Sequence, residues 1–189
     1  MIFYQNAQSL NNKLSDLHIN FNLCLSPPDI LGFSETWLDS SFDNNELKLA
    51  GYNIFRCDRS PTNSTSTKGG GVLLAVKNSI QVLEIINNIN VEEVFVRCNI
   101  NSTKVIVGCV YIPHCSMTEH YKNHCSTIQM LSERFSDDQF IIMGNFNRLN
   151  VTWLADPLRT EHTCYLSPND LDVNSRLCYT YSGINAAQH

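Results

Sequence analysis

Polar residues that can take part in chemistry follow several apolar runs of this sequence, at points where strands are expected to end. Asn6 follows IFYQ, Glu35 follows ILGFS, Tyr111 follows KVIVGCV, and Asn145 and Asn147 follow FIIM. In sheet proteins, ligand sites gather at strand ends, where a rigid scaffold aims side chains into a cleft. A glutamate beside an asparagine can form a Mg²⁺ site, because Mg²⁺ takes one or two protein carboxylates and keeps water and phosphate oxygens as its other ligands. The alternative interpretation is that each residue is an ordinary turn or cap residue.

The stretch GNFN, residues 144–147, raises a question about chemistry at one of these strand ends. Gly144 permits a turn, and two asparagines then follow the buried strand. An amide donates and accepts hydrogen bonds, but it cannot take up a proton or carry charge to a metal ion. A catalytic strand end is therefore expected to carry a carboxylate at one of these positions.

The hydrophobic pattern predicts the elements that would position these residues. Amphipathic helices are expected over 9–25 and 117–135, where apolar residues recur at helical spacing. The order of strands and helices favours an α+β or mixed α/β layered sandwich over a doubly wound parallel sheet. One domain spanning 1–189 is expected, because no repeat or strong linker divides the chain. The expected strands are 1–5, 30–38, 52–59, 72–78, 80–86, 92–100, 104–113, 139–144 and 176–183.

Composition narrows the classes of function. The net charge of −5 argues against non-specific coating of nucleic acid, although it allows a nuclease whose own site is acidic and filled by a metal ion. No apolar run approaches the roughly 18 residues of a membrane span, and no secretory signal is visible. An intracellular location, cytoplasmic or nuclear, is therefore expected. The eight cysteines are predicted to be mostly buried or free thiols.

Two further clusters have competing interpretations. His120 and His124 are four residues apart and could share a helix face that binds zinc, but the scattered ligand types favour a surface helix with incidental histidines. KGGGV, residues 68–72, lacks the pattern of a phosphate-binding loop and indicates a flexible turn that leads into a strand. Trp37 and Trp153 are expected to be core or loop anchors. The local basic cluster either contacts a DNA backbone or is a salt-bridged, solvated surface; it comprises Arg56, Arg59, Lys68 and Lys77.

The order of five motifs resembles the endonuclease/exonuclease/phosphatase superfamily, which includes the apurinic/apyrimidinic endonucleases. The motifs are QNAQSLNNK, SETWL, RCDR with GGGV, VYIP and GNFN. SETWL followed by GGGV resembles one branch in particular, the endonuclease domain of LINE-type (non-LTR) retrotransposons. This resemblance implies an α/β fold of four layers, in which two mixed β-sheets lie face to face with helices outside. It also implies hydrolysis of phosphodiester bonds with a divalent metal, usually Mg²⁺ with Mn²⁺ as an alternative, and DNA as a partner.

The resemblance also assigns roles to individual residues. Glu35 matches the metal-binding glutamate of the family, and Asn6 matches the asparagine beside it. Tyr111 matches a tyrosine that contacts the scissile phosphate. Asn147 matches the asparagine of the family's GDFN motif, which donates to the phosphate or positions the nucleophile. Arg59 and Lys68 are predicted to contact the phosphate backbone of DNA.

Two departures from the family pattern predict impaired catalysis. Asn145 stands where the family has an aspartate that orients water and accepts its proton, and general-base catalysis is typically worth about 10²–10⁴-fold. The family's C-terminal aspartate strand and its SDH motif with a catalytic histidine are absent, so the chain is expected to be roughly the N-terminal three quarters of a domain. His189 matches neither motif. We therefore expect a weak or inactive endonuclease-like domain of a retrotransposon-derived protein, or a non-catalytic remnant that binds DNA or a protein partner, or a non-functional fragment.

Overall fold

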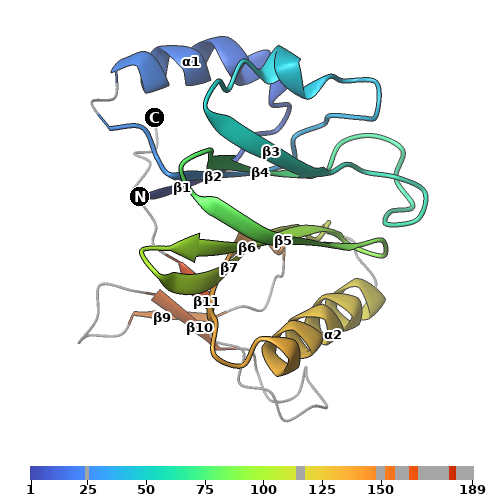
Figure 1. Ribbon diagram of the computed structural model, residues 1–189. Coiled ribbons are helices and arrows are strands. Elements are labelled where there is room, and N and C mark those ends of the chain that lie inside the picture. The colour runs from blue at the N-terminus through green and yellow to red at the C-terminus, as the bar shows by residue number, and fades with distance from the viewer. Residues whose placement is uncertain (24–25, 114–117, 148–151, 156–161, 166–178, 182–189) are drawn as a thin grey trace. The chain divides into compact units, whose positions relative to one another are not determined.

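The computed structural model describes residues 1–23, 26–113, 118–147, 152–155, 162–165 and 179–181. The chain divides into two compact units, Met1–Asn147 and Arg148–His189, which are described separately. In the first unit, two mixed four-stranded sheets lie face to face between two α-helices (Figure 1). The predicted α/β sandwich of two mixed sheets flanked by helices is confirmed. In the part of the chain described here, no helix is both long enough and apolar enough to cross a membrane.

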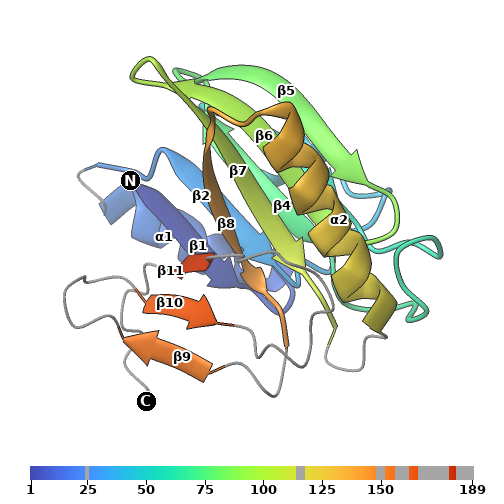
Figure 2. The same cartoon turned by 90° about the horizontal axis from the view of Figure 1, so that it is seen from below.

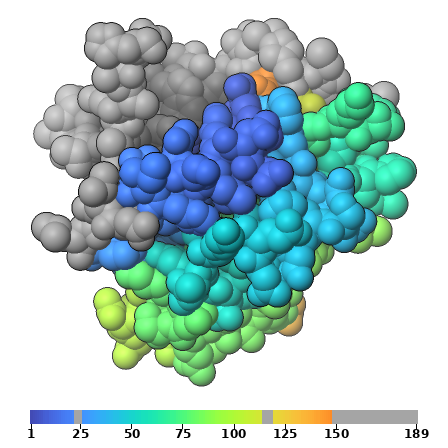
Figure 3. Space-filling model, turned by 90° about the horizontal axis from the view of Figure 1, so that it is seen from above, coloured from blue at the N-terminus to red at the C-terminus, as the bar shows by residue number. Residues whose placement is uncertain are grey.

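The first sheet begins with a parallel pair of strands. β1 runs parallel to β2 with Asn6 opposite Ser34, and the remaining neighbours are antiparallel. The outer face of this sheet is covered by α1, whose surface is seen from above in Figure 3. The order is β1 (Ile2–Asn6), β2 (Ile30–Ser34), β4 (Val72–Lys77) and β3 (Tyr52–Cys57), with α1 at Leu14–Leu23 and 3-10 turns at Asn11–Lys13 and Asn44–Leu47.

The second sheet ends with a parallel pair. β7 runs parallel to β8 with Tyr111 opposite Asn145, and α2 (Thr118–Arg134) connects these two strands across the outer face of the sheet (Figure 2). Because each sheet contains one parallel pair, the carboxyl ends of two neighbouring strands meet at the same edge in each sheet. The order is β5 (Gln81–Asn88), β6 (Glu92–Ile100), β7 (Thr103–Tyr111) and β8 (Gln139–Asn145).

The central strands are buried on both faces, which explains their continuous apolar runs. Alternate residues of β4 face the second sheet, among them Val72 and Leu74, while Leu73 and Ala75 face α1. Burying each such aliphatic side chain contributes about 1.5–3 kcal/mol. Phe95, in β6, lies on the face of the second sheet that α2 covers, where it stacks on a histidine of that helix.

Two element boundaries differ from the sequence prediction for the same reason. The helix expected over 9–25 starts only after Ser9, which has a positive φ of 79°, first as a 3-10 turn at Asn11–Lys13 and then as α1 from Leu14. The strand expected over 30–38 ends at Ser34, because Glu35 takes a φ of 52°. Left-handed conformations interrupt both helices and strands, and hydrophobic periodicity does not report them.

The second unit contains an antiparallel sheet in the order β11, β10, β9. β11 (Tyr179–Tyr181) lies within the strand predicted at 176–183. β9 (Thr152–Ala155) and β10 (His162–Tyr165) were not predicted, because the hydrophobic alternation there is short and weak. Trp153 lies in β9.

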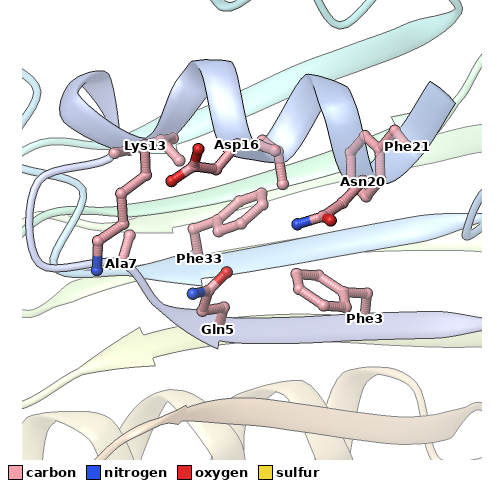
Figure 4. Close-up of a pocket in the computed structure, with 10 residues that line it drawn as sticks. Phe3, Gln5, Ala7, Lys13, Asp16, Asn20, Phe21 and Phe33 are labelled. Atoms are coloured by element: carbon pink, nitrogen blue, oxygen red, sulfur yellow. The ribbon is translucent and has the colours of Figure 1, made fainter. Parts of the chain in front are cut away.

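A cavity of about 470 Å³ lies between α1 and the edge strand β1. Phe3 and Phe33 project into it from the sheet, Phe21 closes it from the helix, and Lys13 and Asp16 line its helical side (Figure 4). None of the residues that line this cavity is among the predicted site residues.

Candidate functional site

Three of the predicted site residues meet in one place. The Nδ2 atom of Asn6 donates a hydrogen bond to Oε1 of Glu35 at 2.8 Å, and Nδ2 of Asn145 donates to the same oxygen at 3.2 Å. Asn6 ends β1, Glu35 follows β2 and Asn145 ends β8, so the contact joins both sheets. The carboxyl ends of the two parallel pairs therefore meet at a carboxylate that two amides surround.

The backbone at Glu35 is held in a left-handed conformation from both sides. On one side, the segment after β1 donates hydrogen bonds from Ser9 N to Glu35 O at 3.0 Å and from Leu10 N to Thr36 O at 2.9 Å. On the other side, Thr36 N donates to Gly71 O at 3.2 Å. A non-glycine residue in this region costs about 1–3 kcal/mol and persists only where its surroundings determine it.

The GGGV segment forms the wall on that second side. Gly70 and Gly71 have φ angles of +70° and +81°, and Trp37 N donates to Gly70 O at 2.9 Å. A Cβ atom on Gly70 would collide with the side chains of Glu92 and Arg59, and one on Gly71 would meet Oγ1 of Thr36 at 2.6 Å. SETWL and GGGV are therefore two sides of one packed loop pair, and the glycines are needed for close approach.

The two predicted DNA-binding residues have different surroundings. Arg59 is only 9% exposed, and its Nε atom donates to Oε1 of Glu92 at 2.8 Å. The same guanidinium donates to the carbonyl of Lys68 and lies 5.7 Å from the ring centroid of Tyr111. The Lys68 side chain is exposed.

The rest of the basic cluster is paired on the protein. Arg56 lies 2.7 Å from a carboxylate oxygen of Asp58, and Lys77 lies 2.8 Å from Asp29. The hydrogen bond from Lys77 lowers the pKa of Asp29, as does the one from the N-terminal amine. The salt-bridged interpretation therefore describes Arg56 and Lys77.

Tyr111 and Asn147 lie beside the group formed by Glu35, Asn6 and Asn145. Tyr111 is 9% exposed. Burial raises the pKa of its hydroxyl, and the negative charge of Glu35 raises it further. Asn147 has a φ of 44°; its backbone N–H donates to Oδ1 of Asn145 at 3.2 Å and its side-chain amide to the carbonyl of Ile112 at 3.1 Å. Asn147 therefore joins the end of β8 to the end of β7.

The prediction of a surface helix with incidental histidines is wrong for His124. This side chain is 1% exposed, its Nδ1 atom lies 2.5 Å from Oε2 of Glu93, and its ring stacks on Phe95 with centroids 6.4 Å apart. The ring of Phe146 lies 5.6 Å away, and Tyr121 donates its hydroxyl to the Phe146 carbonyl at 2.6 Å. Two residues of α2 thus contact the GNFN segment through Phe146.

Sequence reasoning missed the buried acids Glu92 and Glu93 and the position of His124. Adjacent glutamates at the start of a strand read as exposed, so no pattern indicated their burial. For His124 a signal existed, because it lies three residues after Tyr121 and four before Ile128, on the apolar face of the helix.

Trp37 is 51% exposed and has a φ of 57°, so it is a loop residue and not a core anchor. Within the described part of the chain, Cys57, Cys98 and Cys109 form no disulfide. Cys98 and Cys109 are buried within apolar strands, as predicted. Burial raises the pKa of the Cys109 thiol to about 12, so this thiol has no nucleophilic character at neutral pH.

A model of the Endonuclease/Exonuclease/phosphatase family matches residues 5–166, so the chain belongs to this family. No curated protein matches the chain. Among solved structures, a humanised TDP2 from D. rerio superposes with a TM-score of 0.52 at 16% identity, covering 79% of this chain and 66% of that chain. The human Nocturnin catalytic domain with bound sulfate gives 0.52 at 15%, covering 79% and 69%.

A third similar structure is that of the 3′ phosphatase NExo from Neisseria bound to a product DNA hairpin, with a TM-score of 0.52 at 19% identity. It covers 77% of this chain and 57% of that chain. At such identities the likeness shows the fold. The chain thus spans between 57% and 69% of the length of these three structures.

The family generally uses a divalent metal ion, and the described residues allow a test of whether one fits. Oδ1 of Asn6 is buried and accepts no hydrogen bond, while its Nδ2 donates to Glu35. An unpartnered amide oxygen beside a carboxylate is a donor set that suits a hard cation such as Mg²⁺ or Mn²⁺. Within the described ranges, no three His, Cys, Asp or Glu side chains are grouped to hold a metal ion. The side chains that contact Glu35 are amides and not further carboxylates. Glu35 and Asn6 therefore fit a divalent ion that takes one protein carboxylate.

Proposed function

We propose that this chain is the endonuclease-like domain of a retrotransposon-derived protein, a divalent-metal phosphodiester hydrolase of DNA whose catalysis is impaired at Asn145. The observation that carries the proposal is the contact of Asn6 and Asn145 with a single carboxylate oxygen of Glu35. The packing of SETWL against GGGV supports the LINE-type branch, because it explains why both motifs occur together.

Glu35 and the free Oδ1 of Asn6 would hold the metal ion. When bound, the ion supplies positive charge that offsets the negative charge of the phosphoryl oxygens in hydrolysis. The hydroxyl of Tyr111 donates to a phosphate oxygen; its raised pKa keeps it protonated at neutral pH. Lys68 is exposed and contacts the DNA backbone as a point charge.

Asn147 donates a hydrogen bond to the phosphate and keeps Asn145 in place. Its amide donates to the carbonyl of Ile112, and it is joined through its backbone N–H to Asn145. A DNA substrate is supported by two similar structures, NExo bound to a product DNA hairpin and D. rerio TDP2 complexed with a single-strand DNA product.

Asn145 limits the reaction because its amide points a donor at Glu35, where an aspartate would offer an acceptor. An amide cannot accept the proton of an attacking water, and the loss of general-base catalysis costs about 10²–10⁴-fold. The resulting activity is weak or absent.

A second candidate function is that of a non-catalytic remnant that binds DNA or a protein partner through the same surface. One observation favours it. Oε1 of Glu35 already accepts hydrogen bonds from two amides, so this oxygen has hydrogen-bond partners without a metal ion.

Plasmid nicking in the presence of Mg²⁺ tests the proposed function. The native chain, Asn145→Asp and the double variant Asn145→Asp with Glu35→Ala are compared. We expect a weak or silent native chain, clear nicking by Asn145→Asp and silence in the double variant. Nicking that survives Glu35→Ala would contradict the metal site, and a native chain as fast as Asn145→Asp would contradict the impairment. Salt-sensitive DNA binding without nicking by any variant would favour the remnant.

A further inference from the structure

We infer that the buried ion pair of Arg59 and Glu92 is a positioning device that holds Glu35 in its metal-binding conformation, which makes Arg59 and Glu92 positioning residues. This inference rests on the proposed function of Glu35 and names two residues that act on it without touching it. The ion pair lies inside the protein, with exposed fractions of 9% for the Arg59 side chain and 1% for Glu92.

Both oxygens of Glu92 are used to fix the glycine segment. Oε1 accepts from Nε of Arg59 at 2.8 Å, and Oε2 accepts from the backbone N–H of Gly71. Arg59 completes the arrangement by donating to the carbonyl of Lys68. The segment from Lys68 to Gly71 is therefore held at both ends by one charge pair.

The glycine segment in turn fixes the backbone around Glu35. The carbonyl of Gly71 accepts from Thr36 N at 3.2 Å, and that of Gly70 accepts from Trp37 N at 2.9 Å. These bonds flank Glu35 on its C-terminal side, and Glu35 itself has a φ of 52°. A strained residue relaxes when its neighbours loosen, so breaking the ion pair releases the carboxylate from its contact with Asn6.

Arg59 is placed to act through this network more than through DNA. Its side chain is 9% exposed, and its guanidinium is directed to Glu92, to the Lys68 carbonyl and over the Tyr111 ring. A residue that contacts DNA as a positive charge can be replaced by lysine. A planar guanidinium that bridges a carboxylate and a carbonyl cannot, because the three donors of an ammonium group share one nitrogen and do not reproduce the spacing of the guanidinium nitrogens.

The chain offers a matched control at the other end of the second sheet. Arg97 donates from Nε to Oδ2 of Asp138 at 2.5 Å, the side chains are 18% and 3% exposed, and the guanidinium lies 4.2 Å from the ring centroid of Phe135. This pair resembles the first in chemistry. Among the described residues, no hydrogen bond or ion pair joins this pair to the glycine segment or to residues 34–38.

The experiment compares Arg59→Lys and Glu92→Gln with Arg97→Lys and Asp138→Asn in the full chain. Hydrogen exchange at the Thr36 and Trp37 amides reports the loop, and Mn²⁺ titration followed by electron paramagnetic resonance reports the metal site. Far-UV circular dichroism checks that each variant folds. We expect both variants of the first pair to speed exchange at Thr36 and Trp37 severalfold and to weaken Mn²⁺ binding by about 10–100-fold, the range for residues that orient metal ligands. Neither control variant is expected to change either readout.

Three outcomes would overturn the inference: unchanged exchange at Thr36 and Trp37 in both variants of the first pair, an equal increase in the control variants, or an effect of Arg59→Lys that Glu92→Gln does not reproduce. Faster exchange in a chain that binds no Mn²⁺ at all would contradict the proposed function while supporting the positioning of Glu35.

Discussion

The two ends of the second sheet carry similar ion pairs that differ in their effect on the charge of the acid. At the end where β7 and β8 finish, Arg59 pairs with Glu92 beside the ring of Tyr111. At the opposite end, Arg97 pairs with Asp138, the residue before β8. The hydrogen bond from Arg97 lowers the pKa of Asp138, whereas burial raises the pKa of Glu92 despite its bonds from Gly71 and Arg59.

This difference separates a pair that stabilises the fold from one that is kept for another reason. The charged form of Asp138 is favoured in the folded chain, so its pair contributes to stability at neutral pH. Burial disfavours the charged form of Glu92 and raises its pKa, so this pair carries a cost of burial. Buried ion pairs are weak evidence for stability, and the positioning of Glu35 gives this one a purpose.

The largest expected effect comes from crowding the site end. Gly70→Ala places a methyl group against Glu92 and Arg59 at a φ of +70°, whereas Gly51 has a φ of +89° and nothing within 4 Å of an added Cβ. The left-handed conformation alone costs about 1–2 kcal/mol, and the collision adds about 1–3 kcal/mol more. Urea unfolding of Gly70→Ala and Gly51→Ala measures the difference. Equal losses of unfolding free energy in the two variants would mean that Glu92 and Arg59 move to accommodate the methyl group at little cost.

The second expected effect is a loss of stability in Asn145→Asp without metal. The substitution replaces an amide that donates to Glu35 at 3.2 Å with a second negative charge. We expect a loss of about 1–2 kcal/mol from the broken hydrogen bond and the like-charge repulsion. Thermal unfolding in EDTA and in excess Mg²⁺ measures it, and Mg²⁺ should restore the variant more than it stabilises the native chain. Asn99→Asp is a control far along β6, at which Mg²⁺ should have no such effect. A metal-free Asn145→Asp variant as stable as the native chain would count against the contact between residue 145 and Glu35.

A smaller effect distinguishes the two acids by pH. The pKa of Asp138 is lowered in the folded chain. The native chain is therefore more stable than Asp138→Asn above pH 3.8, and this extra stability is lost as the pH falls from 3.8 through the folded pKa. The pKa of Glu92 is raised in the folded chain. The native chain therefore gains stability relative to Glu92→Gln as the pH falls through the folded pKa, and this gain is complete at pH 4.5. Unfolding free energies of the three proteins across this range should give slopes of opposite sign. Slopes of the same sign would remove the distinction between the two ends.

The smallest effect concerns DNA affinity and leaves stability unchanged. Lys68 is exposed at the site end, and Lys104 is exposed at the start of β7, at the other end of the sheet. Lys68→Ala should lower the slope of log affinity against log salt concentration by about one, because one phosphate contact is lost. Lys104→Ala should leave the slope unchanged. Fluorescence anisotropy with a labelled duplex measures both, and equal slopes for the two variants would mean that DNA does not use this end.

The existence of the strands and the closeness of Asn6 to Glu35 could be predicted because they follow from pattern and motif. Strong apolar runs gave the strands of both sheets, and Asn6 and Glu35 stand where two of those runs end. The burial of Glu92 and His124 could not be predicted, because a charged or titratable side chain is buried only when a partner reaches it from elsewhere in the chain. Arg59 and Glu93 are those partners, and they lie 33 and 31 residues away. The left-handed turn at Glu35 was also missed, since the backbone there is held by the glycine segment, a loop that precedes β4 and lies more than 30 residues away in the sequence.

Calorimetric titration with Mn²⁺ tests the central claim most directly, which is that the strand ends form a divalent-metal site weakened by the amide at position 145. The native chain, Asn145→Asp and Glu35→Ala are compared at neutral pH. We predict weak binding by the native chain, binding at least about tenfold tighter by Asn145→Asp because a carboxylate replaces an amide, and none by Glu35→Ala. Equal affinity in all three proteins would contradict the claim.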